Sequence, residues 1–272
     1  MSESNFLKYP VLMIHGMGFR DYKHFCYWGR IPKMLTEMGC SVFFGHQDCN
    51  ARIETNGEVI AARIDEIIAA TGAEKVNIIA HSKGGLDARY AISALGKGDR
   101  VASLTTISTP HNGSRTVDLL LKIPKFLVRF GCFLADLWFR LLGDKKPDTY
   151  AAVLSLKTDS ARKFNEEIRD REGIFYQSYA FVMKNPFSDI FFLIPSAFVW
   201  LIEGENDGLL TPAAVRWGEF RGIYRGVGLR GISHSDEVDM YRRPISKKTG
   251  EGVSEILDVY KSIVTDLKDL GF

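Results

Sequence analysis

One serine stands at an abrupt change of pattern within residues 78–91, IIAHSKGGLDARYA. An apolar run ends at Ala80, Ser82 follows two residues later, and the spacing beyond it predicts a helix. A strand that turns directly into a helix strains the residue at the corner, so the residues two before and two after must be small. Ala80 and Gly84 meet this requirement. The A-x-S-x-G pattern therefore predicts an exposed serine hydroxyl above the edge of a sheet.

Apolar runs and helical patterns alternate on both sides of this corner. Thr55 and Glu58 form a T-x-x-E capping-box pair before one of the helices. The rhythm is typical of a parallel sheet with helices on both faces, whose buried strands are almost continuously apolar. We therefore expect an α/β fold in one domain over residues 1–272, with a mostly parallel central sheet. The predicted strands are 10–18 (ending in a glycine loop), 40–45, 75–80 and 101–108, and the predicted helices are 28–38, 55–72 and 83–95.

Two apolar segments interrupt the rhythm. Residues 117–142 carry a charge in nearly every turn, together with Pro124 and Gly131, which argues against a membrane span. The segment is either a helix pair packed on the core or a mobile cover whose apolar face opens toward a lipid-like substrate. Residues 186–202 are either more of this cover or a strand leading to an acidic turn. We predict a lid insertion at about 114–150, with 186–201 as a second candidate. The charges of the first segment share one helical stripe: Lys122, Lys125, Arg129, Asp136 and Arg140.

Composition and charge restrict the function only weakly. The formal net charge of +2 does not favour a nucleic-acid partner. The four cysteines lack metal-ligand spacing and are interpreted as thiols in or near the core, with a Cys40–Cys49 disulfide as the alternative. The first ten residues, MSESNFLKYP, contain no apolar signal-peptide region. We therefore expect a cytoplasmic protein; a secreted one would require a leader removed from this chain.

A serine hydroxyl is a poor nucleophile until a histidine, oriented by a carboxylate, accepts its proton. On a fold with this serine turn, the expected chain order is serine, acid, histidine. His111 and His234 are the histidines that follow Ser82. His111 precedes every candidate acid in the chain and is interpreted as a loop histidine. His234, in the polar stretch GISHSDEVDM, is the predicted base.

The predicted acid is Asp207, in the segment VWLIEGENDGLLTP. It follows an apolar run and precedes a glycine at the tip of a turn, where a sheet strand would end. Glu203 and Glu205 are nearby competitors.

Two backbone N–H groups are needed to stabilise the oxyanion of an acyl-transfer reaction. Lys83, directly after the serine and at the start of a helix, is one candidate donor. The glycine-rich loop HGMG at 15–18 supplies the other candidate, the N–H of Met17. His15 is interpreted as a scaffold for this loop.

These segments together resemble the α/β-hydrolase superfamily and, within it, the bacterial true lipases (triacylglycerol lipases). VLMIHGMG is similar to the family's oxyanion loop, KVNIIAHSKGGLDARY to its serine turn, and VASLTTISTPHNGS to the next strand and loop. GENDGLL and HSDEV resemble the acid and base segments. The resemblance implies an α/β-hydrolase fold with an inserted helical lid. It also implies a catalytic triad of Ser82, Asp207 and His234, with Met17 and Lys83 forming the oxyanion hole.

The resemblance also implies a structural calcium ion that braces the histidine loop in the secreted lipases. Asp236 matches one acidic ligand and Asp189 is a candidate for the other. The family's glutamine ligand falls on Met240, whose thioether does not bind a hard cation. Ala80 also departs from the glycine of those lipases. The chemistry itself needs no cofactor.

We therefore expect a serine carboxylester hydrolase, a lipase or esterase, that cleaves apolar acyl esters such as acylglycerols through an acyl-enzyme. Its expected partners are a lipid or small ester substrate and, transiently, a lipid interface, with no nucleic acid and no transmembrane segment. Two alternatives remain: an acyltransferase that uses the same triad, and a non-enzymatic lipid-binding protein on a hydrolase scaffold.

Overall fold

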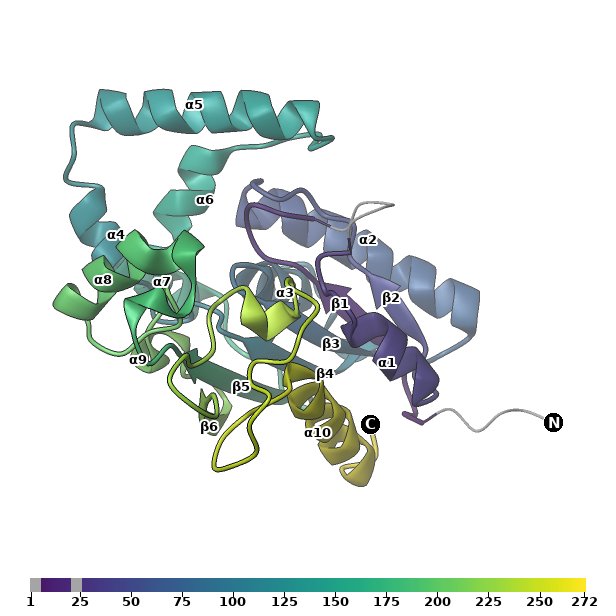
Figure 1. Ribbon diagram of the computed structural model, residues 1–272. Helices are drawn as coiled ribbons and strands as arrows, with labels where there is room; N and C mark the ends of the chain where they lie inside the picture. Colours follow the sequence, from purple (N-terminus) through teal and green to yellow (C-terminus); the bar gives the residue numbers. More distant parts are fainter. Residues whose placement is uncertain (1–5, 21–25) are drawn as a thin grey trace.

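The computed structural model describes residues 6–20 and 26–272. Within them, six strands form one sheet in the order β2-β1-β3-β4-β5-β6, and each neighbouring pair is parallel (Figure 1). Because all the strands run the same way, their carboxyl ends meet at a single edge of the sheet, where ligands bind in open α/β folds. The strands are β1 (Val11–Ile14), β2 (Val42–Phe44), β3 (Val76–His81), β4 (Val101–Ile107), β5 (Phe175–Val182) and β6 (Glu219–Arg225).

Helices cover both faces of the sheet. The apolar side chains of α1 (Ile31–Glu37) and α10 (Ile256–Asp269) join one buried cluster, and those of α2 (Ile53–Thr71) and α3 (Gly84–Ser93) join another. Strands β1, β3 and β4 are buried along their whole length, as expected for a sheet covered on both sides. The predicted α/β architecture is therefore confirmed.

Helix α2 begins earlier than the capping-box pattern predicts. Its N-cap is Arg52, which makes no side-chain cap hydrogen bond, so Thr55 lies inside the helix. Ile53 and Asn56 are both buried, and the Asn56 amide donates to the Asp48 carbonyl at 3.0 Å. These tertiary contacts place the helix start, and the capping-box prediction is wrong.

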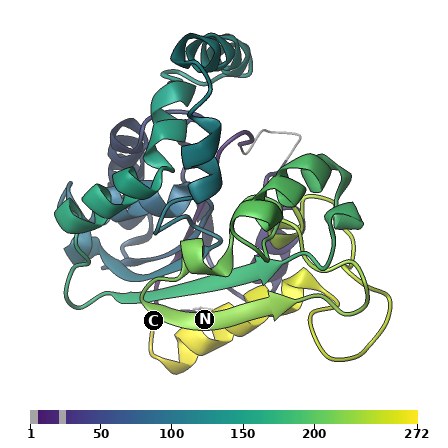
Figure 2. The ribbon, with the colours of Figure 1, turned by 90° about the vertical axis from the view of Figure 1, so that its left-hand side faces the viewer.

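The first interrupting segment forms α4 (Arg115–Leu120) and α5 (Lys125–Leu141), followed by α6 (Thr149–Ser155) and α7 (Thr158–Glu167). Helix α5 stands away from the sheet and adjoins α6, and Figure 2 views it nearly end-on (Figures 1 and 2). Its charged side faces inward: Cys132 is buried and Asp136 accepts the Thr149 N–H at 2.7 Å. Its apolar side is exposed, with Phe126 at 70% and Leu141 at 75%. The alternative of a helix pair packed on the core is therefore wrong for this segment.

The second segment is helical as well, so the alternative of a strand leading to Asp207 is wrong. Short turns η2 (Pro186–Ser188) and η3 (Ile190–Phe192) lead into α8 (Leu193–Ile202), and the small helix α9 (Pro212–Val215) follows later. Two further single turns are η1 (Gly98–Arg100) and η4 (Asp236–Val238). Helix α8 lies near α4 at the same edge of the sheet as the end of β5.

Cys40 carries a free, buried thiol, so the Cys40–Cys49 disulfide is not formed. Burial raises the pKa of the Cys40 thiol to about 11. In the described part of the chain, no helix combines the length and the apolarity needed to cross a bilayer.

Candidate active site

Ser82 sits at a strained corner between β3 and α3. Its φ is +53°, a left-handed conformation that is rare for a residue with a Cβ. Its N–H donates to the Ile107 carbonyl of the adjacent strand at 2.9 Å. A Cβ added at Gly84 would lie 2.3 Å from the His15 carbonyl oxygen, so this position must be glycine. The small residue that the sequence predicts two positions after the serine is thus required by close approach of the backbone.

Asp207 and His234 form a buried acid–base pair. The Nδ1–H of His234 donates to Asp207 Oδ2 at 2.8 Å, and the His234 backbone N–H donates to the Asp207 carbonyl, also at 2.8 Å. Asp207 Oδ1 accepts the N–H groups of Leu209 and Leu210 at 2.9 and 2.8 Å. Burial alone would raise the pKa of Asp207, but the His234 ring and the two amides together hold this pKa below its usual value. The carboxylate is therefore ionised and leaves the second ring nitrogen of His234 available as a base.

The pair lies beside the serine corner. His81, the last residue of β3 and the neighbour of Ser82, has its ring centroid 4.3 Å from that of His234. Phe192 approaches the His234 imidazole edge-on, with 6.2 Å between the ring centroids. Segments that are far apart in the chain therefore meet at the carboxyl edge of the sheet.

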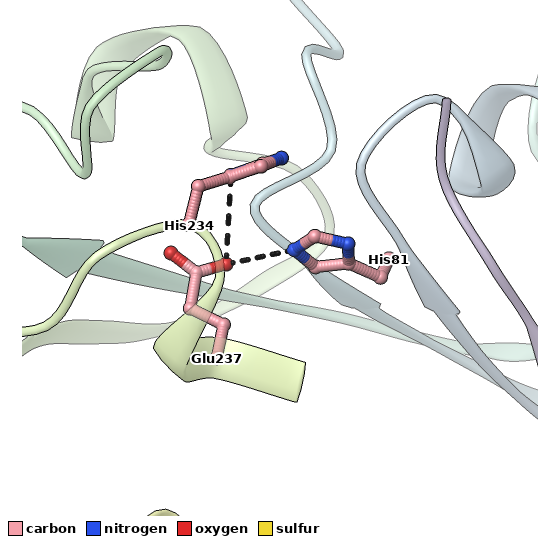
Figure 3. Close-up of side chains that lie close together, drawn as sticks. All are labelled: His81, His234 and Glu237. Atoms are coloured by element: carbon pink, nitrogen blue, oxygen red, sulfur yellow. Dashed lines mark hydrogen bonds and ion pairs between the residues drawn. The ribbon is translucent and has the colours of Figure 1, made fainter. Parts of the chain in front are cut away.

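Glu237 is a site residue that sequence reasoning missed. Its Oε2 lies 3.1 Å from His81 Nε2 and 3.8 Å from His234 Nδ1 (Figure 3). On the far side of His81, Nδ1 is 2.6 Å from the Tyr27 hydroxyl, which also accepts the Gly16 N–H at 3.1 Å. A hydrogen-bonded chain thus connects the histidine loop to the glycine loop after β1. An acidic residue so close to the predicted base was the signal available in the sequence.

Burial favours the uncharged forms of the two titratable groups in this chain. It raises the pKa of Glu237 well above its usual value and lowers the pKa of His81 well below its own. A protonated Glu237 can donate to His81 Nε2, and a neutral His81 that accepts there carries its own proton on Nδ1, which faces the Tyr27 hydroxyl. His81, His234 and Glu237 also place three potential metal-ligand atoms within 4.8 Å of one another. His81 Nε2 is bonded to Glu237 Oε2 and His234 Nδ1 to Asp207 Oδ2, so we interpret the cluster as a hydrogen-bonded network.

The two predicted oxyanion donors flank the serine corner. Lys83 is the N-cap residue of α3, and Met17 lies in the loop after β1. The neighbouring amides of that loop are occupied, since Gly16 donates to Tyr27 and Gly18 donates to the Asn50 side chain at 3.1 Å. Among the hydrogen bonds of the described residues, none uses the N–H of Met17 or of Lys83. Both groups are therefore available to an external acceptor.

An apolar cavity of about 320 Å³ opens at Ser82. Its size is typical of small-molecule sites, and its walls come from α4, α8 and the loops after β4 and Asp207. The lining residues are largely apolar and include Val117, Leu120, Pro195, Phe198, Val199 and Leu210.

The structure separates the competing acids and histidines. Glu203 accepts from the Ser114 and Thr116 hydroxyls at 3.0 and 2.7 Å, and Glu205 forms an exposed ion pair with an arginine of β6. His111 is buried and stacks on Trp217 at 5.3 Å, in keeping with its interpretation as a loop histidine. Among the three candidate acids, Asp207 is the one bonded to His234.

The calcium candidates come together, but protein groups occupy their oxygens. Asp189 accepts from the Tyr241 hydroxyl at 2.9 Å, and Asp236 pairs with Arg230 at 2.9 Å. The Ser233 hydroxyl lies between the two carboxylates, 2.6 Å from Asp189 and 2.9 Å from Asp236. Ca²⁺ takes six to eight oxygen ligands from carboxylates, carbonyls and water, and it binds poorly where a cation already neutralises its carboxylates. With an arginine on one carboxylate, these residues do not fit the ion.

The sequence segment that holds the serine corner also decides the family. The model of the palmitoyl protein thioesterase family matches residues 10–163, more than half of the chain. The chain belongs to the palmitoyl protein thioesterase family. The match includes Ser82, Met17 and Lys83 and ends before Asp207.

Curated relatives of this family member extend the similarity over nearly the whole chain. A triacylglycerol lipase of Vibrio cholerae serotype O1 is 28% identical, with 90% of this chain and 89% of the relative covered. Triacylglycerol lipase 2 of Saccharomyces cerevisiae is 27% identical, with 90% of this chain and 74% of the relative covered.

Solved structures show the same fold. The lipase of Staphylococcus hyicus superposes with a TM-score of 0.70 at 16% identity, covering 98% of this chain and 97% of that one. A mature lipase of Bacillus licheniformis gives a TM-score of 0.68 at 21% identity, covering 98% and 95%. The predicted α/β-hydrolase fold is thereby confirmed.

Proposed function

We propose that this family member is a lipase or esterase that cleaves apolar acyl esters, such as acylglycerols, through an acyl-enzyme on Ser82. One observation carries the proposal: a serine in a left-handed corner opens into an apolar cavity beside a buried histidine–aspartate pair. The names of the curated relatives and of the solved neighbours agree with this chemistry.

The proposed reaction has two half-reactions. His234 Nε2 takes the proton of Ser82 as Oγ attacks the ester carbonyl, and Asp207 stabilises the resulting imidazolium. The N–H groups of Met17 and Lys83 donate to the tetrahedral oxyanion. The C–O bond to the alcohol breaks, and the alcohol leaves with the proton from His234. Water then attacks the acyl-enzyme by the same route, which releases the acid and restores Ser82.

The cavity beside Ser82 supports an apolar acyl group as the bound part of the substrate. Its walls offer almost no polar groups other than the Ser82, Ser114 and Thr116 hydroxyls. The cavity therefore favours acyl groups that bury methylene groups in it. Each methylene moved from water into such a site contributes about 0.8 kcal/mol.

Helix α5 supports contact with a lipid interface. Its outward face gathers large apolar side chains, including Phe126, Phe130 and Leu141, which are 61% to 75% exposed. The described chain places nothing over this face, and Lys122 and Lys125 flank its start. An amphipathic helix of this kind lies in the plane of a lipid surface. We therefore assign α4 and α8, which line the cavity, and the exposed helix α5 to the lid.

A fluorophosphonate probe tests the proposed nucleophile. We expect the wild type to be labelled and Ser82→Ala to be unlabelled, whereas Ser93→Ala, at the far end of the same helix, is labelled normally. Absence of labelling in the folded wild type would instead support a lipid-binding protein. Product analysis with an added alcohol separates hydrolysis, which yields free acid, from acyl transfer, which yields a new ester.

The lid assignment has its own test. Phe130→Glu places a charge on the exposed face of α5, so cleavage of a soluble short-chain ester is expected to be unchanged. Cleavage of emulsified triacylglycerol is expected to fall about tenfold or more, because burial of one aromatic side chain at the interface is lost. The matched control is Leu270→Glu, at the exposed end of α10. If both variants lowered the cleavage of emulsified triacylglycerol equally, the assignment of α5 to the lipid interface would be contradicted.

A further inference from the structure

Arg230 clamps two segments that are distant in sequence. Its Nε donates to the Ser188 carbonyl at 2.7 Å, and its Nη2 donates to Asp236 Oδ1 at 2.9 Å. The Asp236 side chain is only 4% exposed and the Arg230 side chain 24%. The guanidinium therefore ties the turn before Asp189 to the loop that carries His234.

Two carboxylates meet at this clamp. Asp189 Oδ2 and Asp236 Oδ2 lie 2.6 and 2.9 Å from the same Ser233 hydroxyl. A hydroxyl has one proton and can donate to only one of them at a time. The Tyr241 hydroxyl donates to Asp189, but a second negative charge this close still requires a cation nearby. Arg230 supplies that charge through Asp236.

We infer that Arg230 performs, from within the chain, the bracing that the lipase resemblance assigns to Ca²⁺, and that it is a positioning residue for His234. Asp236 lies two residues after His234, and its Oδ2 accepts the N–H of Ser233, the residue directly before. Arg230 thus holds an acceptor that fixes the backbone next to the proposed base. Its influence on catalysis rests on the proposed function, whereas its influence on the stability of the loop does not.

The two aspartates form a latent cation site. The oxygen ligands that a divalent ion prefers are already close together, and the guanidinium takes up the charge that such an ion would supply. If the guanidinium is removed, the carboxylates become uncompensated and gain affinity for a divalent cation. Dependence on Ca²⁺ would then arise from the loss of one arginine.

The experiment compares thermal unfolding of the wild type and Arg230→Met, each in EDTA and in millimolar CaCl₂. We expect the Tm of the wild type to be the same in both. The Tm of Arg230→Met is expected to be lower by roughly 4–10 °C in EDTA, since one partner of a buried pair is lost, and to recover in part with CaCl₂. The kcat of Arg230→Met for a soluble ester is expected to be lower than that of the wild type in EDTA and to recover in part with CaCl₂. Its KM is expected to change little.

Three further proteins complete the test. Arg225→Met removes an arginine whose partner, Glu205, is exposed, and is expected to leave Tm unchanged and insensitive to CaCl₂. Arg230→Lys keeps the positive charge and serves as the test if Arg230→Met does not fold. Its Tm is expected to lie between those of the wild type and Arg230→Met. The double variant Arg230→Met with Asp236→Asn removes the uncompensated charge, and is expected to lose the response to CaCl₂.

The inference is overturned if EDTA lowers the Tm of the wild type and CaCl₂ restores it, because a metal would then be the resident cation. It is also overturned if Arg230→Met and Arg230→Lys both unfold at the temperature of the wild type. If these shifts in Tm occur in a protein that cleaves no ester, the proposed function fails and the bracing role of Arg230 stands.

Discussion

The substitution Gly16→Ala tests how tightly the glycine loop must approach the serine corner. A Cβ at position 16 would lie 2.6 Å from the Cβ of Ser82 and 3.0 Å from the Tyr27 hydroxyl, where ordinary contacts begin at 3.4 Å and extend to 4 Å. The two segments would therefore have to separate by about 1 Å. Both of the proposed oxyanion donors lie on these segments, Met17 on one and Lys83 on the other.

The magnitude follows from this separation. A misplacement of about 1 Å at a reacting centre costs on the order of 10²-fold in rate, which corresponds to about 2.7 kcal/mol of transition-state stabilisation. We therefore expect Gly16→Ala to reduce kcat for a soluble p-nitrophenyl ester about 100-fold. KM is expected to change little, because apart from Ser82 the residues that line the acyl cavity lie on other segments.

Steady-state kinetics and thermal unfolding measured on the same preparation check this expectation. Gly131→Ala is the matched control, since a Cβ there meets nothing within 4 Å and position 131 lies inside α5. A folded Gly16→Ala protein with nearly wild-type kcat would refute the reasoning, because the loop and the corner could then separate without consequence for the chemistry.

Three further predictions concern the pair, the buried network and the cavity. Asp207→Asn is expected to lower kcat roughly 10⁴-fold with little change in Tm, because the amide still accepts from the backbone but imposes the wrong tautomer on His234; a loss below tenfold would contradict an essential role. Burial raises the pKa of Glu237 well above 4.5, so its folded form keeps a proton that the unfolded chain releases. Its contribution to the free energy of unfolding is therefore present at low pH and is lost as pH rises above 4.5, and Glu237→Gln is expected to gain stability relative to wild type as pH rises above that value in urea unfolding; parallel pH curves would argue for an ionised Glu237. Val117→Phe narrows the cavity and is expected to lower kcat/KM for long acyl chains while sparing butyrate, each excluded methylene costing about fourfold; a uniform loss across an ester series would place the acyl chain elsewhere.

The serine corner was predictable because its requirements are local. The small residues at positions 80 and 84, the apolar run before them and the helix after them all lie within one short stretch. The pairing of Asp207 with His234 is not local, but the expected chain order of serine, acid and histidine left few candidates, and the hydrogen bond between the two residues agrees with the choice. The first four strands were equally predictable from their continuous apolar runs, whereas β5 and β6 were not assigned from the sequence.

The features that escaped prediction depend on tertiary contacts. Tyr27, His81 and Glu237 are brought together by three separate segments, and no periodicity links them. The amphipathic pattern of α5 predicted two faces without indicating which one is buried; the contact of Asp136 with α6 decides this. The start of α2 is likewise placed by burial of Asn56 rather than by the sequence of its first turn.

The hydrogen bonds that join His234 to Asp207 through both side chain and backbone have a consequence during synthesis. The ribosome releases the nucleophile early and its activating pair late, since both members of that pair follow residue 200. A nascent chain that already displays its serine corner lacks the acid–base pair until the segment that carries Asp207 and His234 has also emerged. If the proposed function holds, the chain gains activity toward esters only after that segment has folded onto the sheet.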